Sequence, residues 1–284
     1  MSRIAVLADI HGNLPALVAV IEDMAQFDVD QVVVAGDSIN WGPYSAQVVE
    51  RIVSENWAVI RGNNELYLLD FDTPRAPEVW KTYEALPWFF EHLREWQSII
   101  ACWPDTLQLR FSDAPPVRVF HGIPGNPWEA IFPNTPDEDV RVMLAGVEEK
   151  TLICAHNHLI MDRSCDPWHI LNPGSVGVGL DGNRDASYMI LEGQRDCWVA
   201  TVRRVPYDRS PIFAEFERLG FLDHTGITGH IVIEEFRTAR LIILPFWEWC
   251  RLEHPDEEPS RPLLDEFLTV DPHPYLPTSY AELL

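Results

Sequence analysis

Five short apolar segments of this chain each lead into a residue that can bind a metal ion. Each segment is four to six residues long, which suits a buried strand better than a helix. The segments and the polar residues that follow them are 3–8 with Asp9 and His11, 32–35 with Asp37, 57–60 with Asn63, 117–120 with His121, and 151–155 with His156 and His158. In open α/β sheets, ligands bind at the carboxyl ends of the strands. The pattern therefore predicts an α/β fold in which distant parts of the chain build one site.

The first 62 residues predict a β-α-β-α-β unit. Apolar residues recur at helical spacing over 13–27 and again over 44–56. These two segments separate the apolar strands expected at 3–8, 31–35 and 57–60, and the connections are short. Such alternation is typical of a parallel sheet with right-handed crossovers.

The middle of the chain changes from a helical to a strand-like pattern. Residues 64–97 are rich in aromatic side chains and are predicted to be mainly helical, whereas 106–111 alternates as a half-buried strand does. Further strands are expected near 117–120, 151–155, 158–162, 168–171, 186–191 and 196–203, with a helix near 137–145. This β-rich half predicts a second sheet packed on the first, with helices outside.

The last part of the chain, 209–284, reads as an extension appended to a domain that covers 1–208. A helix is expected over 212–219, and 228–253 contains a long apolar stretch. The last thirty residues are rich in proline and acidic residues and show little periodicity. We expect this helical or irregular extension to cover a sheet edge, the mouth of the site or a second copy of the chain. In the last case the protein would be a homo-oligomer, and that alternative stays open.

The charge of the chain restricts its partners. The net charge is −23. Nonspecific nucleic-acid binding depends on lysine and arginine, so it is not expected here. A surface this acidic also repels anionic substrates, and any phosphate chemistry would need local positive charge of the kind that bound divalent cations supply.

The cysteines and the termini indicate a cytoplasmic protein. The five cysteines are widely spaced and form no C-x-x-C pair, which favours free thiols in a reducing compartment. The first strand begins by residue 3, which leaves no room for a signal peptide. No run of about 18 apolar residues occurs, so no membrane partner is expected.

The seven polar residues at the strand ends suit a pair of divalent metal ions. Transition metals take imidazole nitrogen together with carboxylate and amide oxygen. Two such ions about 3.5–4 Å apart activate water and stabilise both the attacking and the leaving oxygen at phosphorus. That chemistry needs a bridging carboxylate and several neutral ligands, and the set contains both: Asp9, His11, Asp37, Asn63, His121, His156 and His158.

These residues resemble the signature of the calcineurin-like metallophosphoesterases. That signature runs D-x-H, G-D-x-x-x-x-G, G-N-H-D/E, a lone H and G-H-x-H. This chain has, in the same order, Asp9-Ile10-His11, Gly36-Asp37 with Gly42, Gly62-Asn63-Asn64-Glu65, His121-Gly122 and Ala155-His156-Asn157-His158. The segments 172–177 and 205–208 are similar to the small bacterial and archaeal phosphodiesterase branch. The resemblance covers about residues 1–208.

The resemblance implies a fold and a set of roles. The fold is a four-layer α/β/β/α sandwich with two mixed sheets. Asp9, His11 and His158 would bind the first ion, Asn63, His121 and His156 the second, and Asp37 would bridge the two. The ions would be Mn, Fe, Zn or Ni, and a metal-bridging hydroxide would attack a small-molecule phosphate ester.

Two positions depart from the signature. Asn64 stands where many relatives have a histidine that assists the leaving group, and Ala155 replaces a glycine. Asparagine cannot act as a general acid at neutral pH, although its amide can donate a hydrogen bond to phosphate. This favours phosphodiesters such as cyclic nucleotides, whose leaving groups need less protonation. A phosphoprotein phosphatase, a dinucleoside tetraphosphate hydrolase and a metal-binding scaffold without activity stay open as alternatives.

Four residues near the expected ions are candidates for substrate contact. Asn63 and Asn64 could orient the phosphoryl oxygens, with Asn64 and Asp37 as the expected catalytic pair. Arg61 either approaches the phosphate or pairs with a surface carboxylate. Trp41 either stacks on a base or packs in the interior.

Overall fold

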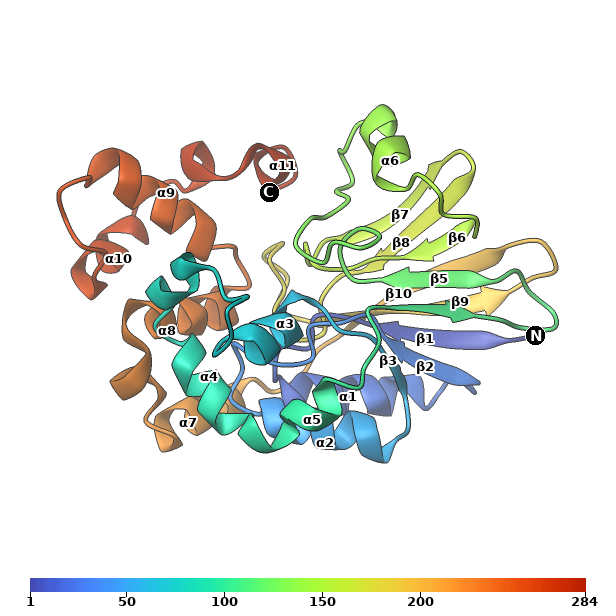
Figure 1. Ribbon diagram of the computed structural model, residues 1–284, viewed down its shortest axis with the longest axis horizontal. Helices are drawn as coiled ribbons and strands as arrows, with labels where there is room; N and C mark the ends of the chain where they lie inside the picture. The colour runs from blue at the N-terminus through green and yellow to red at the C-terminus, as the bar shows by residue number, and fades with distance from the viewer.

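Two mixed β-sheets of five strands each form the centre of the computed structural model, which describes residues 1–284 (Figure 1). The first sheet has the order β10 (Trp198–Val205), β9 (Ala186–Gly193), β1 (Arg3–Leu7), β2 (Gln31–Val34) and β3 (Ala58–Val59). Strands β1, β2 and β3 are parallel, and β9 is antiparallel to both β1 and β10. The parallel unit predicted for the first 62 residues is confirmed.

The second sheet contains the strands expected in the β-rich middle of the chain. Its order is β4 (Thr106–Leu109), β5 (Val117–Phe120), β6 (Thr151–Ile153), β8 (Trp168–Pro173) and β7 (Ile160–Cys165). The three inner strands are parallel and the two edge strands are antiparallel to their neighbours. The strand expected over 158–162 begins at Ile160 instead, because His158 belongs to the loop that enters the candidate site.

Strand β1 shows why the sheets lie between other layers. Ile4 and Val6 pack between the two sheets, against residues such as Val119 of β5. Ala5 and Leu7 point to the other face, where they contact the helices. Successive side chains of a strand alternate between faces, so a strand that is apolar throughout must be covered on both.

Helices form the outer layers. α1 (Leu14–Met24), α2 (Ser45–Ser54) and the short α5 (Gln97–Ile100) pack against the first sheet. On the second sheet the outer layer is thin and consists of α6 (Asp137–Met143), whose Val140 contacts Leu152. The predicted four-layer α/β/β/α sandwich is confirmed.

The aromatic segment after β3 is mainly helical, as expected. It contains α3 (Asn63–Asp70), the 3-10 turns η1 (Glu78–Thr82) and η2 (Arg94–Trp96), and α4 (Leu86–His92) between them. The aromatic rings of α4 pack on the C-terminal part of the chain: Trp88 meets Phe221 edge to face, with centroids 5.0 Å apart.

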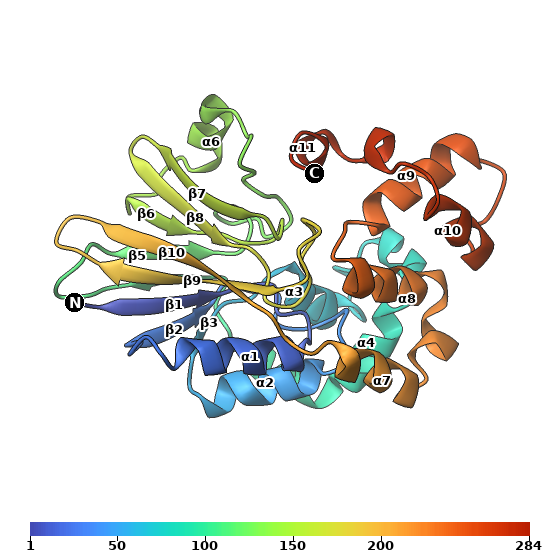
Figure 2. The same cartoon turned by 180° about the vertical axis from the view of Figure 1, so that it is seen from behind.

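The C-terminal part is a group of helices beyond the carboxyl ends of the strands, on the side away from the N-terminus (Figures 1 and 2). It comprises α7 (Ser210–Arg218), α8 (Phe221–Thr238), α9 (Ile243–Glu253), α10 (Arg261–Phe267), η3 (His273–Tyr275) and α11 (Thr278–Ala281). α8 is kinked at Gly226, whose φ of 51° and ψ of −145° are not helical. No helix of the structure has both the length and the apolarity needed to span a membrane.

Candidate metal centre

The loops that follow β1, β2, β3, β5 and β6 bring all seven predicted ligand residues to one place. Two groups of three can be separated, and within each group the candidate ligand atoms lie within 4.8 Å of one another. The first group is Asp9, His11 and His158, and the second is Asp37, His121 and His156. Asn63 joins the second group, since its Oδ1 lies 3.0 Å from Nε2 of His121.

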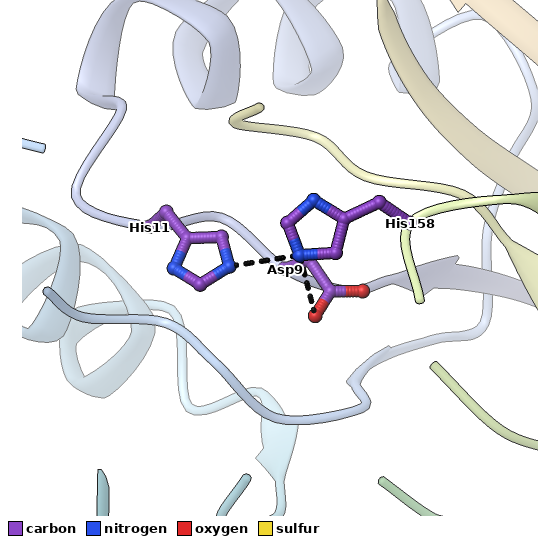
Figure 3. Close-up of side chains that lie close together, drawn as sticks. All are labelled: Asp9, His11 and His158. Atoms are coloured by element: carbon purple, nitrogen blue, oxygen red, sulfur yellow. Dashed lines mark hydrogen bonds and ion pairs between the residues drawn. The ribbon is translucent and has the colours of Figure 1, made fainter. Parts of the chain in front are cut away.

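In the first group two imidazoles and a carboxylate converge on one point (Figure 3). Nε2 of His11 and Nε2 of His158 are 3.1 Å apart, although the two residues lie far apart in the sequence. Nε2 of His158 lies 3.6 Å from Oδ1 of Asp9. The three side chains direct unshared electron pairs to the same space, which is the geometry that a cation needs.

Asp37 lies between the two groups. Its Oδ2 is 3.3 Å from Nε2 of His121 in the second group and 3.8 Å from Nε2 of His11 in the first. A single carboxylate oxygen therefore faces both groups, and Asp37 occupies the position that a bridging ligand requires.

The backbone is strained at these residues. Asp9, His11, Asp37, His156 and His158 all have a positive φ, between 47° and 74°. This left-handed conformation is uncommon for residues other than glycine, and five of the seven candidate ligands adopt it. Strained residues persist only where the surrounding structure holds them in place, and they gather at functional sites.

The surroundings of the Asp9 carboxylate show whether a cation fits the site. Its side chain is fully buried, and neither carboxylate oxygen has a hydrogen-bond partner in the protein. His11 Nδ1 is also buried without a partner. Burying a carboxylate without a compensating group is strongly unfavourable. A divalent cation held by Asp9, His11 and His158 would supply the missing partner, so the residues present fit a metal ion.

The protonation states of the imidazoles also suit metal binding. Burial, together with the neighbouring His158, lowers the pKa of His11 to about 3. Burial likewise lowers the pKa of His156 and of His158 to about 4. These three side chains are therefore neutral at physiological pH, and neutral imidazole is the form that binds metals.

The other groups show opposing effects of burial and charge. Burial would lower the pKa of His121, but the carboxylate of Asp37 and its hydrogen bond raise it to about 10. Burial favours a raised pKa for Asp37, but the imidazole of His121 outweighs it and holds that pKa well below the usual range. Burial raises the pKa of Asp9 well above its usual value. Such perturbed groups in one cluster are characteristic of functional sites.

Backbone carbonyls orient two of the imidazoles. Nδ1 of His121 donates to the carbonyl of Ala35 at 2.8 Å, and Nδ1 of His158 donates to that of Val178 at 2.6 Å. Because a carbonyl can only accept, each proton is fixed on Nδ1 and Nε2 faces the site. This is the outer support that metal-binding histidines usually have.

Glu65 supports the loops of the candidate site, a role that its place in the motif did not predict. Its fully buried carboxylate accepts hydrogen bonds from the backbone amides of Asp37 at 3.0 Å, Ser38 at 2.8 Å and Gly62 at 2.7 Å. Glu65 is the third residue of α3, and the bond from Gly62 forms half of a capping box. A glutamate three residues after the N-cap residue, here Gly62, was the signal that could have identified it.

Asn64 contacts Asp37 twice. Its side-chain amide donates to Oδ2 of Asp37 at 2.6 Å, and its backbone amide donates to Oδ1 at 2.8 Å. The amide of Asn40 in turn donates to the backbone carbonyl of Asn64 at 3.0 Å. A Cβ at Gly62 would overlap the carboxylate of Asp37, so only glycine fits beside this pair. Asn64 therefore positions the shared carboxylate.

Sequence comparison agrees with this geometry. The calcineurin-like phosphoesterase superfamily domain matches residues 2–196, more than half of the chain. The chain belongs to that superfamily. An uncharacterized protein of Methanocaldococcus jannaschii, MJ0912, is 28% identical over an alignment of 235 residues, and the match covers 73% of this chain and 88% of that protein.

Two solved structures share the fold of this chain. A metallophosphoesterase from Sphaerobacter thermophilus has a TM-score of 0.64 at 23% identity and covers 84% of this chain and 99% of its own. The hypothetical protein PH1004 from Pyrococcus horikoshii OT3 has a TM-score of 0.70 at 20% identity. That match covers 85% of this chain and 100% of the PH1004 chain. At these identities the likeness shows the fold alone.

The remaining two candidates for substrate contact, Arg61 and Trp41, have different positions. Arg61 does not line the cavity beside the candidate ligands, because its guanidinium forms an ion pair with Asp105, with Nη2 2.7 Å from Oδ1. The pairing of Arg61 with a carboxylate is therefore observed, and its contact with phosphate stays a prediction. Trp41 lines the cavity and also packs edge to face on Phe89, with centroids 6.2 Å apart.

A cavity of about 330 Å³ opens beside the two groups. Residues from the sandwich and from the C-terminal helices line it together: His11, Asp37, Trp41, Asn63, Asn64, Tyr67, Tyr83, Trp128, His156, His158, Val178, Leu180, Val232, Glu235, Phe236, Leu241, Ile243, Leu244, Trp247 and Tyr280. No motif or spacing in the sequence predicted that Glu235, Trp247 and Tyr280 line this cavity. The mouth of the site was one of the places expected for the extension, and part of it lies there.

Proposed function

We propose that this protein is a divalent-metal-dependent phosphodiesterase. The observation that carries the proposal is the pair of ligand groups with Asp37 between them and the unpartnered carboxylate of Asp9. Membership of the calcineurin-like phosphoesterase superfamily supports phosphate-ester hydrolysis as the reaction class.

The residues divide between two ions. Asp9, His11 and His158 would hold one ion, Asn63, His121 and His156 would hold the other, and Asp37 would be shared. Imidazole, carboxylate and amide ligands suit Mn, Fe, Zn or Ni. When bound, two such ions neutralise charge on the phosphate ester and activate water for attack at phosphorus.

The protein's own residues favour a diester over a monoester. The leaving alkoxide of a simple monoester needs a proton, and Asn64, in the position of the histidine found in many relatives, has none to give. Its amide donates to Asp37 at 2.6 Å and so holds the shared carboxylate in place. Diesters such as cyclic nucleotides depend less on a proton donor. The free cysteines are in keeping with action in the cytoplasm.

The test is hydrolysis of bis-p-nitrophenyl phosphate by protein loaded with Mn²⁺, with metal stoichiometry measured by calorimetry. We expect turnover by the wild type and a loss of about 100-fold or more in His158→Ala. The matched control is His169→Ala, because His169 pairs with Asp162 on the second sheet, away from the cavity. Metal binding without turnover of any diester would instead favour a metal-binding scaffold.

A further inference from the structure

The C-terminal extension shares the cavity with the candidate metal ligands. On one side lie His11, Asp37 and His158, and on the other lie Leu244, Trp247 and Tyr280 from α9 and α11. The remaining part of a molecule whose phosphate contacts the ligand groups can therefore reach the extension within the same cavity.

Several contacts fix the extension to the sandwich. The hydroxyl of Tyr280 donates to the backbone carbonyl of Asn157 at 3.3 Å, in the loop between His156 and His158. The carboxylate of Glu84 accepts from the backbone amide of Ile227 at 2.9 Å, beside the kink in α8. Helices α7 and α8 also share a buried apolar cluster with α4. The wall that these helices form is thus a built part of the site.

The cavity is lined by carboxylates without cationic side chains to balance them. No lysine or arginine lines it, and the one charged side chain on the extension's side is the carboxylate of Glu235. Its Oε1 accepts from the backbone amides of Ile242 and Ile243 at 2.8 and 2.9 Å, which holds the carboxylate in place. Anionic groups beyond the phosphate at the ions would face this carboxylate without a cation to balance them.

The remaining surface is apolar and aromatic. Of the 20 residues that line the cavity, 13 are hydrophobic. Tyr67 packs edge to face on Trp128, with centroids 4.9 Å apart, and on Tyr83 at 6.1 Å. Rings held in this way present fixed faces and edges on which a flat group can stack. At about 330 Å³ the cavity accepts a small-molecule group and is too small for a folded protein surface.

We propose that the extension, together with the rings of Tyr67, Tyr83 and Trp128, forms the binding site for the alcohol part of the substrate, and that this part is an uncharged aromatic or apolar group attached to a single phosphate. The inference rests on the proposed function, because it places the phosphate at the ligand groups. It disfavours polyphosphates, whose additional charges would have no partner, and it disfavours phosphoproteins.

The test is calorimetric binding of three phosphonates to the Mn²⁺-loaded protein at pH 8. Phenylphosphonate should bind at least about tenfold more tightly than methylphosphonate, because the ring buries apolar surface. 4-Carboxyphenylphosphonate should bind about tenfold more weakly than phenylphosphonate, because its carboxylate faces that of Glu235. In Glu235→Gln the ratio of the two dissociation constants should be smaller than in the wild type. Equal affinity for the methyl and phenyl compounds, or stronger binding of the carboxylated ring, would overturn the proposal.

Two leucines of α9 give a matched pair of variants. Leu244 lines the cavity and Leu252 does not, yet they are 46% and 49% exposed, so neither replacement should unfold the protein. Leu244→Ala should weaken phenylphosphonate about threefold or more and leave methylphosphonate within twofold, whereas Leu252→Ala should change neither. Equal effects of the two variants would contradict a role for the extension.

Binding and turnover separate this inference from the proposed function. The phosphonates are not hydrolysed, so their order of affinity is measured without activity. If the protein binds phenylphosphonate preferentially but hydrolyses no diester, only the proposed function fails. If it hydrolyses diesters but binds all three phosphonates alike, only the inference about the extension fails.

Discussion

The carboxylate of Glu65 accepts a hydrogen bond from the backbone amide of Asp37 at 3.0 Å. The same carboxylate also holds the amides of Ser38 and Gly62. One buried side chain at the start of α3 therefore ties together the loop after β2, which carries Asp37, and the loop after β3, which leads into Asn63 at the start of α3. The relative position of two candidate ligands depends on this glutamate.

Replacing Glu65 should damage both stability and metal binding. Glu65→Ala leaves three backbone amides without their acceptor, and each unsatisfied buried group costs about 1–3 kcal/mol. We expect a loss of about 3 kcal/mol or more in the free energy of unfolding, measured with urea, and metal affinity at least about tenfold lower. Glu65→Gln, which keeps the shape and one acceptor oxygen, should lie between the wild type and the alanine variant.

The control for Glu65 is Glu78→Ala. Glu78 pairs with Lys81 on the surface, with Oε2 2.6 Å from Nζ, and both side chains are largely exposed. Exposed pairs contribute little, so this variant should stay within about 0.5 kcal/mol of the wild type and bind metal normally. Similar losses in both glutamate variants would show that the three amide bonds of Glu65 have no special role.

Introducing a histidine at position 64 should shift the preference toward monoesters. Asn64→His supplies a titratable proton donor beside Asp37, and general acid catalysis typically contributes 10²–10⁴-fold where a leaving group needs a proton. The variant also loses the amide bond to Asp37 at 2.6 Å, so the rate on diesters should fall. We expect the ratio of kcat/KM for phenyl phosphate to that for bis-p-nitrophenyl phosphate to rise at least fivefold.

Asn64→Ala separates the two effects of that substitution. Alanine removes the bond to Asp37 and adds no acid, so both substrates should be hydrolysed more slowly and their ratio should change little. A rise in the monoester ratio in the alanine variant would mean that space at position 64, rather than a proton donor, limits monoester hydrolysis.

The sequence predicted the part of the site that depends on local order along the chain. Buried parallel strands have a strong apolar signal, and each ligand residue directly follows one of them. Asp9 and His121 could therefore be assigned to the same edge of the sandwich before their partners were known. Because parallel strands have their carboxyl ends on one side of the sheet, the residues that follow these strands lie near one another.

The other half of the cavity could not be predicted in this way. Glu235, Trp247 and Tyr280 belong to three different helices, α8, α9 and α11, and nothing in their spacing relates them to residues 9–158. They reach the cavity only because α8 packs on α4 and because Tyr280 bonds to Asn157. Arg61 shows the opposite case: it directly precedes Gly62 of the motif, yet Asp105 holds it outside the cavity.

Glu235 should make the stability of the protein depend on pH. Burial raises its pKa from 4.5 to about 7, against the effect of the bonds from Ile243 and Ile242. Between these pH values the folded state binds the proton that the unfolded state has lost, so stability falls as the pH rises from 4.5 to 7. Urea unfolding should show the wild type losing about 1–3 kcal/mol relative to Glu235→Gln over this range.

The control for Glu235 is Glu217→Gln on the exposed surface of α7. Its pH profile should run parallel to that of the wild type. A wild-type profile that stays parallel to that of Glu235→Gln would mean that this carboxyl keeps an ordinary pKa in the folded protein.

Removing the metal should destabilise the protein, and the effect should depend on Asp9. A ligand present at about 1,000 times its dissociation constant stabilises the folded state by about 4 kcal/mol. Treatment with a chelator should therefore lower the free energy of unfolding by several kcal/mol. The loss should be measured with urea on the same preparation before chelation, after chelation and after Mn²⁺ is restored.

Asp9→Asn distinguishes loss of the metal from general damage. In the metal-free protein both oxygens of the buried Asp9 carboxylate lack a partner, so a neutral amide of the same shape should relieve that cost. We expect the metal-free variant to be at least as stable as the metal-free wild type and to gain far less stability from Mn²⁺. If Asp9→Asn weakens the metal-free and Mn²⁺-treated proteins equally, the carboxylate stabilises the fold and does not hold a cation.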